Sequence, residues 1–238
     1  MNLISRVLDF ALYVGTIPFL CVGLFALIDA NLVSRGGLVD NDLAEIAKDD
    51  NGNKRLFSRL DEESQYVIAW LTILETNINY PVVQGDDNNW FLNRNYKGDF
   101  ATAGSIFLDY RNSSSFTDYF SIIYGHRMGN GEMFSDIYKF KDRAYFDEHR
   151  RGMLRMRDYD LQVVVVSYAE VDANDWNIYN VGRSRNDKNV VKYIMDRAEI
   201  VVDDVGAESH LLLSTCDGDK KNKRDVLLIG VLDAKTKR

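Results

Sequence analysis

The chain has two cysteines and three histidines, and any thiol nucleophile and its acid or base must come from these residues. Cys21 falls in an uncharged, apolar stretch near the N-terminus, which leaves Cys216 as the single thiol of the polar remainder. Cys216 ends a run, 210–216, whose side chains would alternate between two faces of a strand, and residues 217–219 then predict a turn. A thiol where a strand meets a loop favours a reactive group, and the alternative is a small buried hydrophobe.

His126 is the histidine that best suits this thiol. It ends a second strand-like run, 121–126, next to a glycine that allows close approach. His210 precedes Cys216 on the same expected strand and lies about 20 Å away at ~3.3 Å per residue, too far for direct proton transfer. His149 lies in a polar stretch that predicts a solvated helix end. We therefore expect Cys216 and His126 to meet from different parts of the fold.

Arg224 is a candidate for a third catalytic group. A strand is expected at 226–232, so a hairpin would return Arg224 to the neighbourhood of Cys216. Its guanidinium stays protonated and could stabilise the oxyanion that forms when a thiolate attacks a carbonyl. The alternative, that this lysine-rich loop is only a solvated basic surface, remains open on these grounds.

Short strands must hold these groups in place. The patterns of β-branched and aromatic residues predict about eight strands, a number typical of an all-β sandwich or barrel. The strands are expected at 67–73, 78–83, 104–109, 120–124, 153–156, 161–167, 210–215 and 226–232. Helical patterns interrupt them near 133–149 and 188–198, and their apolar stripes are more typical of core-facing surfaces than of cofactor sites.

The N-terminal region has a different composition. The stretch from Phe10 to Ile28 carries no charge and as a helix would span about 28 Å, near the thickness of a bilayer core. An uncleaved anchor is favoured over a cleaved signal peptide, and a buried soluble helix is the third option. Arg6 mildly favours a large domain outside the cell. We expect an anchor at 1–30, a helical arm at 31–65 and a catalytic domain at 66–238.

Bulk composition bounds the partners. The net charge of −7 argues against nucleic acid, because phosphate binding requires a basic surface. The scattered histidines and the single thiol outside the apolar stretch offer no metal cluster.

Together the motifs resemble a known family. The run Tyr124-Gly125-His126-Arg127-Met128, the run Leu213-Ser214-Thr215-Cys216 and Arg224 eight residues later are similar to a class B sortase. Segments 80–85, 104–112 and 131–136 resemble the same class, as do the apolar stretch and the helical arm. One departure is Glu75-Thr76, where the class commonly has Gly-Thr.

The resemblance implies an eight-stranded β-barrel with added helices, and a catalytic set of Cys216, His126 and Arg224. It implies that the long connection before the cysteine strand helps to form a substrate groove, which Tyr124 and Ser214 line. Asn88 and Leu92 are further substrate-binding candidates by their spacing.

It also implies a chemistry: cleavage of a C-terminal sorting motif of secreted proteins through a thioester on Cys216. The acyl group then passes to a peptidoglycan cross-bridge amine, without a metal or cofactor. The implied location is the cell membrane, with the catalytic domain on the extracellular side. Three alternatives remain open: a pilin polymerase that uses a pilin lysine, a hydrolytic cysteine protease and a catalytically silent binding module.

Overall fold

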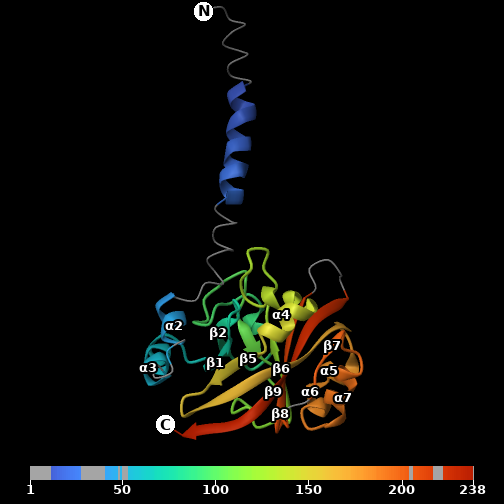
Figure 1. Cartoon of the computed structure of the whole chain (residues 1–238). Helices are drawn as coiled ribbons and strands as arrows, with labels where there is room; N and C mark the ends of the chain where they lie inside the picture. The colour runs from blue at the N-terminus through green and yellow to red at the C-terminus, as the bar shows by residue number, and fades with distance from the viewer. Residues whose placement is uncertain are drawn as a thin grey trace, which may run out of the picture.

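The computed structural model describes residues 12–27, 41–47, 49, 53–203, 206–216 and 222–237, and for Asn41, Cys216 and residues 233–237 it describes the backbone alone. Residues 12–27 form a helix with exposed apolar side chains, drawn in blue in Figure 1. The remainder of the expected anchor lies outside the described residues. Among the helices of the described ranges, none is both long and apolar enough to cross a membrane.

The large domain that follows the N-terminal helix is built on one closed sheet. Its strands follow the order β5-β1-β2-β3-β4-β8-β9-β6, and pairing between β5 and β6 closes this set of eight into a barrel, with β7 added alongside β6. The strands are β1 (Val67–Ile73), β2 (Asn79–Val83), β3 (Ile106–Leu108), β4 (Phe120–Tyr124), β5 (Arg151–Arg155), β6 (Tyr159–Asp172), β7 (Ile200–Val201), β8 (Ser209–Cys216) and β9 (Lys223–Lys237). The predicted eight-stranded barrel is therefore confirmed.

Two strands are longer than their sequence patterns predict. β6 and β9 pair in antiparallel register from Tyr159↔Lys237 to Asp172↔Lys223, with two register shifts along the way. Both shifts fall at or within the expected segment 161–167, and the expected segments 161–167 and 226–232 cover only the middle of the ribbon. The missed residues are its two ends, which carry more polar side chains. β7 is too short to leave any periodic pattern.

The expected helix at 133–149 is two elements. A 3₁₀ helix, η2 (Ser135–Lys141), ends before α4 (Arg143–Glu148) because Asp142 is extended there and its side chain accepts a hydrogen bond from the Tyr145 amide. This is an N-cap, which starts a new helix. The second expected helix is present as α7 (Asn189–Met195). The shorter η1 (Trp90–Leu92), α5 (Trp176–Tyr179) and α6 (Val181–Ser184) were not predicted.

The expected helical arm packs on the barrel. It comprises α2 (Asn41–Ile46) and α3 (Asn53–Glu63), which lie beside β1 and β2 in Figure 1. Leu56 and Leu60 of α3 are fully buried in one cluster with Trp70 of β1 and Phe91 of η1. On another side of the barrel, α5, α6 and α7 cover β8 and β9 through a second apolar cluster.

Candidate active site

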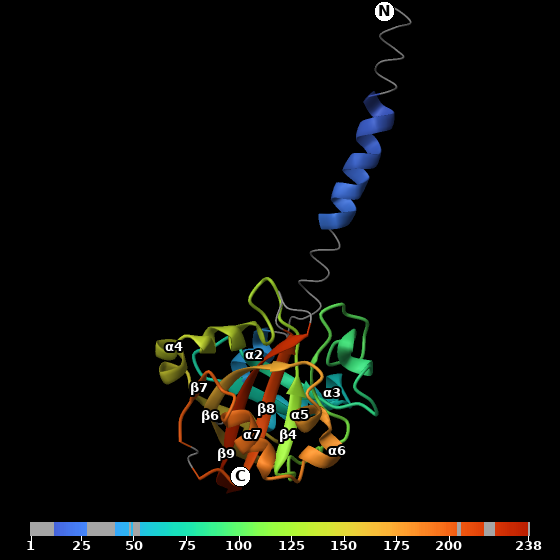
Figure 2. The same cartoon turned by 90° about the vertical axis from the view of Figure 1, so that its right-hand side faces the viewer.

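Three neighbouring strands bring distant sequence segments to one end of the barrel. β4 and β8 are parallel, with Tyr124 opposite Ser214, and the Gly125 amide donates to the Ser214 carbonyl at 3.1 Å. Two residues beyond that pair, the chain reaches His126 on one side and Cys216 on the other. β4, β8 and β9 lie side by side in Figure 2.

Cys216 and Arg224 are the last residue pair of β8 and β9 on this edge, directly opposite each other in antiparallel register. The hairpin inferred from the sequence is therefore present. The Cys216 side chain lies outside the described part of the chain, as do Lys220 and Lys221. The Arg224 guanidinium carbon lies 5.7 Å from the centroid of the Tyr179 ring.

A cavity of about 330 Å³ occupies this end of the barrel. Five of the predicted site residues line it, namely Asn88, Leu92, Tyr124, His126 and Arg224. The remaining described lining residues are Asn89, Ser105, Phe107, Arg111, Gly125, Ala173 and Tyr179. Ser214, predicted to line the groove, is instead fully buried, and its Oγ lies 3.0 Å from the hydroxyl of Tyr179. Ser214 is therefore linked to the cavity by its hydrogen bond to Tyr179, which lines it.

Asp109 organises one wall of the cavity, and the sequence assigned it no role. Its fully buried carboxylate accepts hydrogen bonds from Asn88 Nδ2 at 2.8 Å, Arg111 Nε at 2.9 Å and the Tyr124 hydroxyl at 3.1 Å. Arg111 also donates to the carbonyl of Tyr179 at 3.2 Å. The four polar groups therefore form one network that fixes the walls before a ligand arrives.

The ionisation of this network follows from its contacts. Burial alone raises the pKa of Asp109, but the hydrogen bonds from Arg111 and Asn88 outweigh it, and the pKa lies below its usual value. Burial, together with the neighbouring Asp109 carboxylate, raises the pKa of Tyr124 far above its usual value. At neutral pH the wall therefore holds an ionised Asp109 carboxylate that accepts a hydrogen bond from the neutral Tyr124 hydroxyl.

The loop that carries His126 folds tightly. The His126 carbonyl accepts from the Phe134 amide at 3.0 Å. A Cβ placed on Gly125 would lie 2.6 Å from the Phe134 ring, so the close approach inferred at this glycine is present. The other two histidines lie elsewhere: His210 pairs with Phe120 at the far end of β4 and β8, and His149 follows α4 with its Nδ1 2.8 Å from the Tyr145 carbonyl oxygen.

Three residues of the site's hydrogen-bond network were not predicted, namely Asp109, Arg111 and Tyr179, and only the first two lie in a recognisable sequence pattern. Asp109 and Arg111 fall inside the segment 104–112 that resembled the family, and an acid at the end of an apolar strand was a usable sign. Tyr179 sits on a four-residue helix in a long connection and left no such sign. Within the described ranges, no group of three or more histidine, cysteine, aspartate or glutamate side chains is placed to hold a metal ion.

Comparison with known proteins identifies the family to which this chain belongs. A model described as the sortase domain matches residues 71–230. The chain is 31% identical over 173 residues to sortase B of Listeria monocytogenes, covering 71% of this chain and 70% of that protein.

Two solved structures extend the likeness. The sortase B from the type II pilus of Streptococcus pneumoniae is 34% identical, with 76% of this chain and 98% of that chain covered and a TM-score of 0.61. A Streptococcus pyogenes class B sortase involved in pilus biogenesis is 27% identical, with coverages of 74% and 97% and a TM-score of 0.66. The chain belongs to the sortase family, the cysteine transpeptidases built on this barrel, and within it to class B.

Proposed function

We propose that Cys216 is the nucleophile of this sortase, His126 its general acid and base, and Arg224 the group that stabilises the oxyanion. The observation that carries the assignment is that His126 and Arg224 line one cavity while the backbone of Cys216 ends the strand between theirs. Directly opposed residues of an antiparallel pair have Cβ atoms about 4.5–5.5 Å apart, which suits a guanidinium acting beside a thiolate.

The proposed reaction has two halves. The Cys216 thiolate adds to a backbone carbonyl within a C-terminal sorting motif, and Arg224 stabilises the negative charge that develops on the oxygen. His126 protonates the leaving amine as the C–N bond breaks, which leaves a thioester. It then takes a proton from the incoming amine, whose nitrogen displaces the thiolate.

Asn88, Leu92 and Tyr124 are proposed to contact the peptide, because they line the same cavity. The Asp109 network holds Asn88 and Tyr124 in fixed positions, which lowers the ordering cost of binding. Ser214 is proposed to act on the peptide only indirectly, through its hydrogen bond to Tyr179.

The proposed acceptor is an amine of the cell wall, a peptidoglycan cross-bridge. A pilin lysine is the second candidate, and it is supported by two similar structures, one from a type II pilus and one of a sortase involved in pilus biogenesis. Both acceptors use the same chemistry and differ in the surface that must approach the thioester.

We also propose that the chain is held in the cell membrane by its N-terminal region, with the catalytic domain outside. Support comes from the uncharged sequence between Phe10 and Ile28 and from the helix at 12–27, whose large apolar side chains are exposed. Fractionation of cells that produce the full chain, and of cells that produce residues 31–238, tests this. The full chain is expected in the membrane fraction and the truncated chain in the medium or soluble fraction; equal partitioning would refute the anchor.

Acyl-enzyme trapping tests the catalytic assignment. The domain is incubated with a library of sorting peptides, and mass spectrometry identifies the peptide and the modified residue. We expect one class of peptide to be attached to Cys216 and no peptide to be attached to Cys216→Ala. If the protein were a catalytically silent binding module, Cys216→Ala would keep the full biological activity. Failure of every peptide to acylate an intact thiol would refute the proposal.

A competition between acceptors tests the second half of the reaction. The trapped peptide is supplied with a cross-bridge peptide and purified pilin together, and the ligated product identifies the acceptor. A hydrolytic protease would give the same free acid at the same rate whether or not an amine is present.

A further inference from the structure

Behind the catalytic residues lies a buried acid that the proposed reaction does not use. Asp225 follows Arg224 on β9, and because side chains alternate along a strand the two point to opposite faces. Arg224 lines the cavity, whereas Asp225 is 1% exposed. A carboxylate buried to this degree is costly unless its partners compensate, so the identity of those partners indicates its purpose.

Two partners of Asp225 come from other parts of the fold. The Tyr168 hydroxyl of β6 donates to Asp225 Oδ1 at 2.6 Å. On the other side, Arg127 Nη1 lies 3.7 Å from Asp225 Oδ2. Arg127 is the residue next to His126, so the ion pair ties the histidine loop to the strand that carries Arg224.

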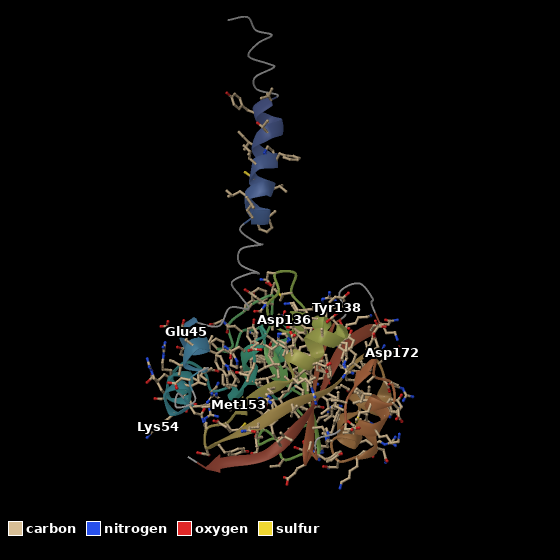
Figure 3. All side chains as sticks on the ribbon, in the orientation of Figure 1. Glu45, Lys54, Asp136, Tyr138, Met153 and Asp172 are labelled. Carbon is tan, nitrogen blue, oxygen red and sulfur yellow. The ribbon has the colours of Figure 1, made fainter. Side chains whose placement is uncertain are left out.

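The same loop is held from its outer side. The Arg127 guanidinium lies 4.5 Å from the ring centroid of Tyr138, which is on η2 and is labelled with its neighbour Asp136 in Figure 3. Arg127 also forms an isolated bridge with Met133. The guanidinium is therefore clamped between a buried carboxylate and an aromatic ring, which leaves the adjacent residue little freedom.

We propose that Asp225 is a positioning residue: through Arg127 it fixes the loop of His126 relative to the Cys216–Arg224 hairpin. This inference rests on the proposed roles of those three residues. Proton transfer requires hydrogen-bond geometry, and a displacement of about 1 Å can lower a rate by about 100-fold. Asp225 thus acts on the acid and base of the reaction without touching substrate.

The test uses Asp225→Asn, which keeps the size of the side chain and an acceptor for Tyr168 but removes the charge that attracts Arg127. The substrate is the peptide that acylates the wild-type enzyme in the library. We expect kcat to fall by about 10- to 100-fold with KM changed less than about threefold. Asp225→Glu is expected to restore part of the loss.

A double-mutant cycle separates positioning from stability. Arg127→Met should lower kcat like Asp225→Asn, and the double variant should be no worse than either single one, because both remove the same contact. Asp160→Asn is the matched control: Asp160 is also a buried carboxylate paired with an arginine, Arg155, at 3.5 Å, but neither residue lines the cavity. We expect Asp160→Asn to lower the melting temperature and to leave kcat at the wild-type value.

A measurement without substrate keeps this inference separate from the proposed function. Carbon-13 imidazole spectra of the three histidines, with His126 assigned by His126→Ala, should show a shifted or broadened His126 signal in Asp225→Asn. The signals of His149 and His210 should stay in place. An unchanged His126 signal together with unchanged kcat overturns the positioning role, whereas a wild-type enzyme that no peptide acylates overturns the proposed function instead.

Discussion

At the scale of single residues, the site divides into groups that would react and groups that hold them. Arg224 belongs to the first kind, because it lines the cavity and is registered opposite Cys216. Asp109 belongs to the second, because it is fully buried and its hydrogen bonds end on residues that line the wall. Substitution of a group of the first kind should lower kcat, whereas substitution of a group of the second kind should lower the free energy of unfolding.

Arg224→Ala is expected to lower kcat by about 100- to 1,000-fold, the usual loss when an oxyanion donor is removed. Arg224→Lys should recover only part, because an ammonium keeps the charge without the planar fork of donors. Steady-state kinetics with the library peptide measure both. Lys223→Gln is the control for lost charge in the same hairpin, and an equal loss there would contradict a specific role for Arg224.

Asp109→Asn tests the wall and its pH dependence. The pKa of Asp109 is lowered in the folded state, so its ionisation stabilises the protein above the unfolded pKa of about 3.9, and this contribution disappears as pH falls through the folded value. We expect the free energy of unfolding of the variant to be about 2–3 kcal/mol lower than that of wild type at pH 7. This difference should become smaller below about pH 4, where the wild-type carboxylate is also protonated.

Urea unfolding across this pH range makes the Asp109 measurement. Asp61→Asn provides the comparison, since Asp61 pairs with Arg157 at 2.6 Å on the exposed surface and should cost less than about 1 kcal/mol. If the difference in unfolding free energy between Asp109→Asn and wild type stays constant with pH, the charge of the Asp109 carboxylate does not stabilise the protein.

At the scale of elements, the loop after β4 depends on one small residue. Gly125→Ala would place a methyl group 2.6 Å from the Phe134 ring, so the loop that carries His126 must move. We expect a loss of about 1–3 kcal/mol in stability and a fall in kcat larger than stability alone explains. Gly129→Ala, in the same loop but with open space around the added atom, should match wild type in both.

The turn after β1 carries the departure from the family pattern at Glu75. Its backbone has φ 61°, a left-handed conformation that suits the glycine common in the class. This turn is far in sequence from the loop that follows His126, but it contacts that loop: the Asn77 amide donates to the Asp136 carboxylate at 2.8 Å, and Asn77 Nδ2 donates to the Gly131 carbonyl at 3.2 Å. The turn therefore supports the loop that follows His126.

Glu75→Gly is expected to stabilise the protein by about 0.5–1 kcal/mol, because relief of the left-handed strain exceeds the added entropy of the unfolded glycine. Thermal unfolding measures the gain. Glu75→Ala keeps the Cβ and should give none, and a lower melting temperature for Glu75→Gly would mean that the side chain makes a contact worth more than the strain.

The strand pattern could be predicted from the sequence better than the site could. The runs of β-branched and aromatic residues at 67–73 and 120–124 mark β1 and β4 to the residue, because both strands are short and almost wholly buried. Arg224 was reached by hairpin geometry, which is a local argument. Asp109 and Tyr179 could not be assigned in this way, because their roles depend on contacts between segments distant in sequence.

At the scale of the whole molecule, the helical arm is part of the barrel domain in packing terms. Leu56 and Leu60 are buried against Trp70 and Phe91, so the arm covers an apolar face of the sheet. Removing residues 1–40 should leave the melting temperature within a few degrees of the full chain. Removing residues 1–65 should expose that face and lower stability by more than about 4 kcal/mol, since each buried leucine contributes about 2–5 kcal/mol.

Differential scanning calorimetry of the two truncated chains measures this difference. The shorter truncation serves as the control for removal of N-terminal sequence as such. Equal melting temperatures for both would mean that α2 and α3 form an independent unit whose contacts with the barrel contribute little.

The parallel pairing of β4 with β8 has a consequence for synthesis. A ribosome delivers His126 long before Cys216, and Arg224 emerges later still, near the end of the chain. Parallel strands so distant in sequence pair late, because the loop between them must first be closed. With the roles proposed above, a nascent chain would hold its acid and base without a nucleophile, and later a nucleophile without its oxyanion partner. Reactivity would then begin only when β9 joins the barrel, so that an unfinished chain would neither cleave nor cross-link its neighbours.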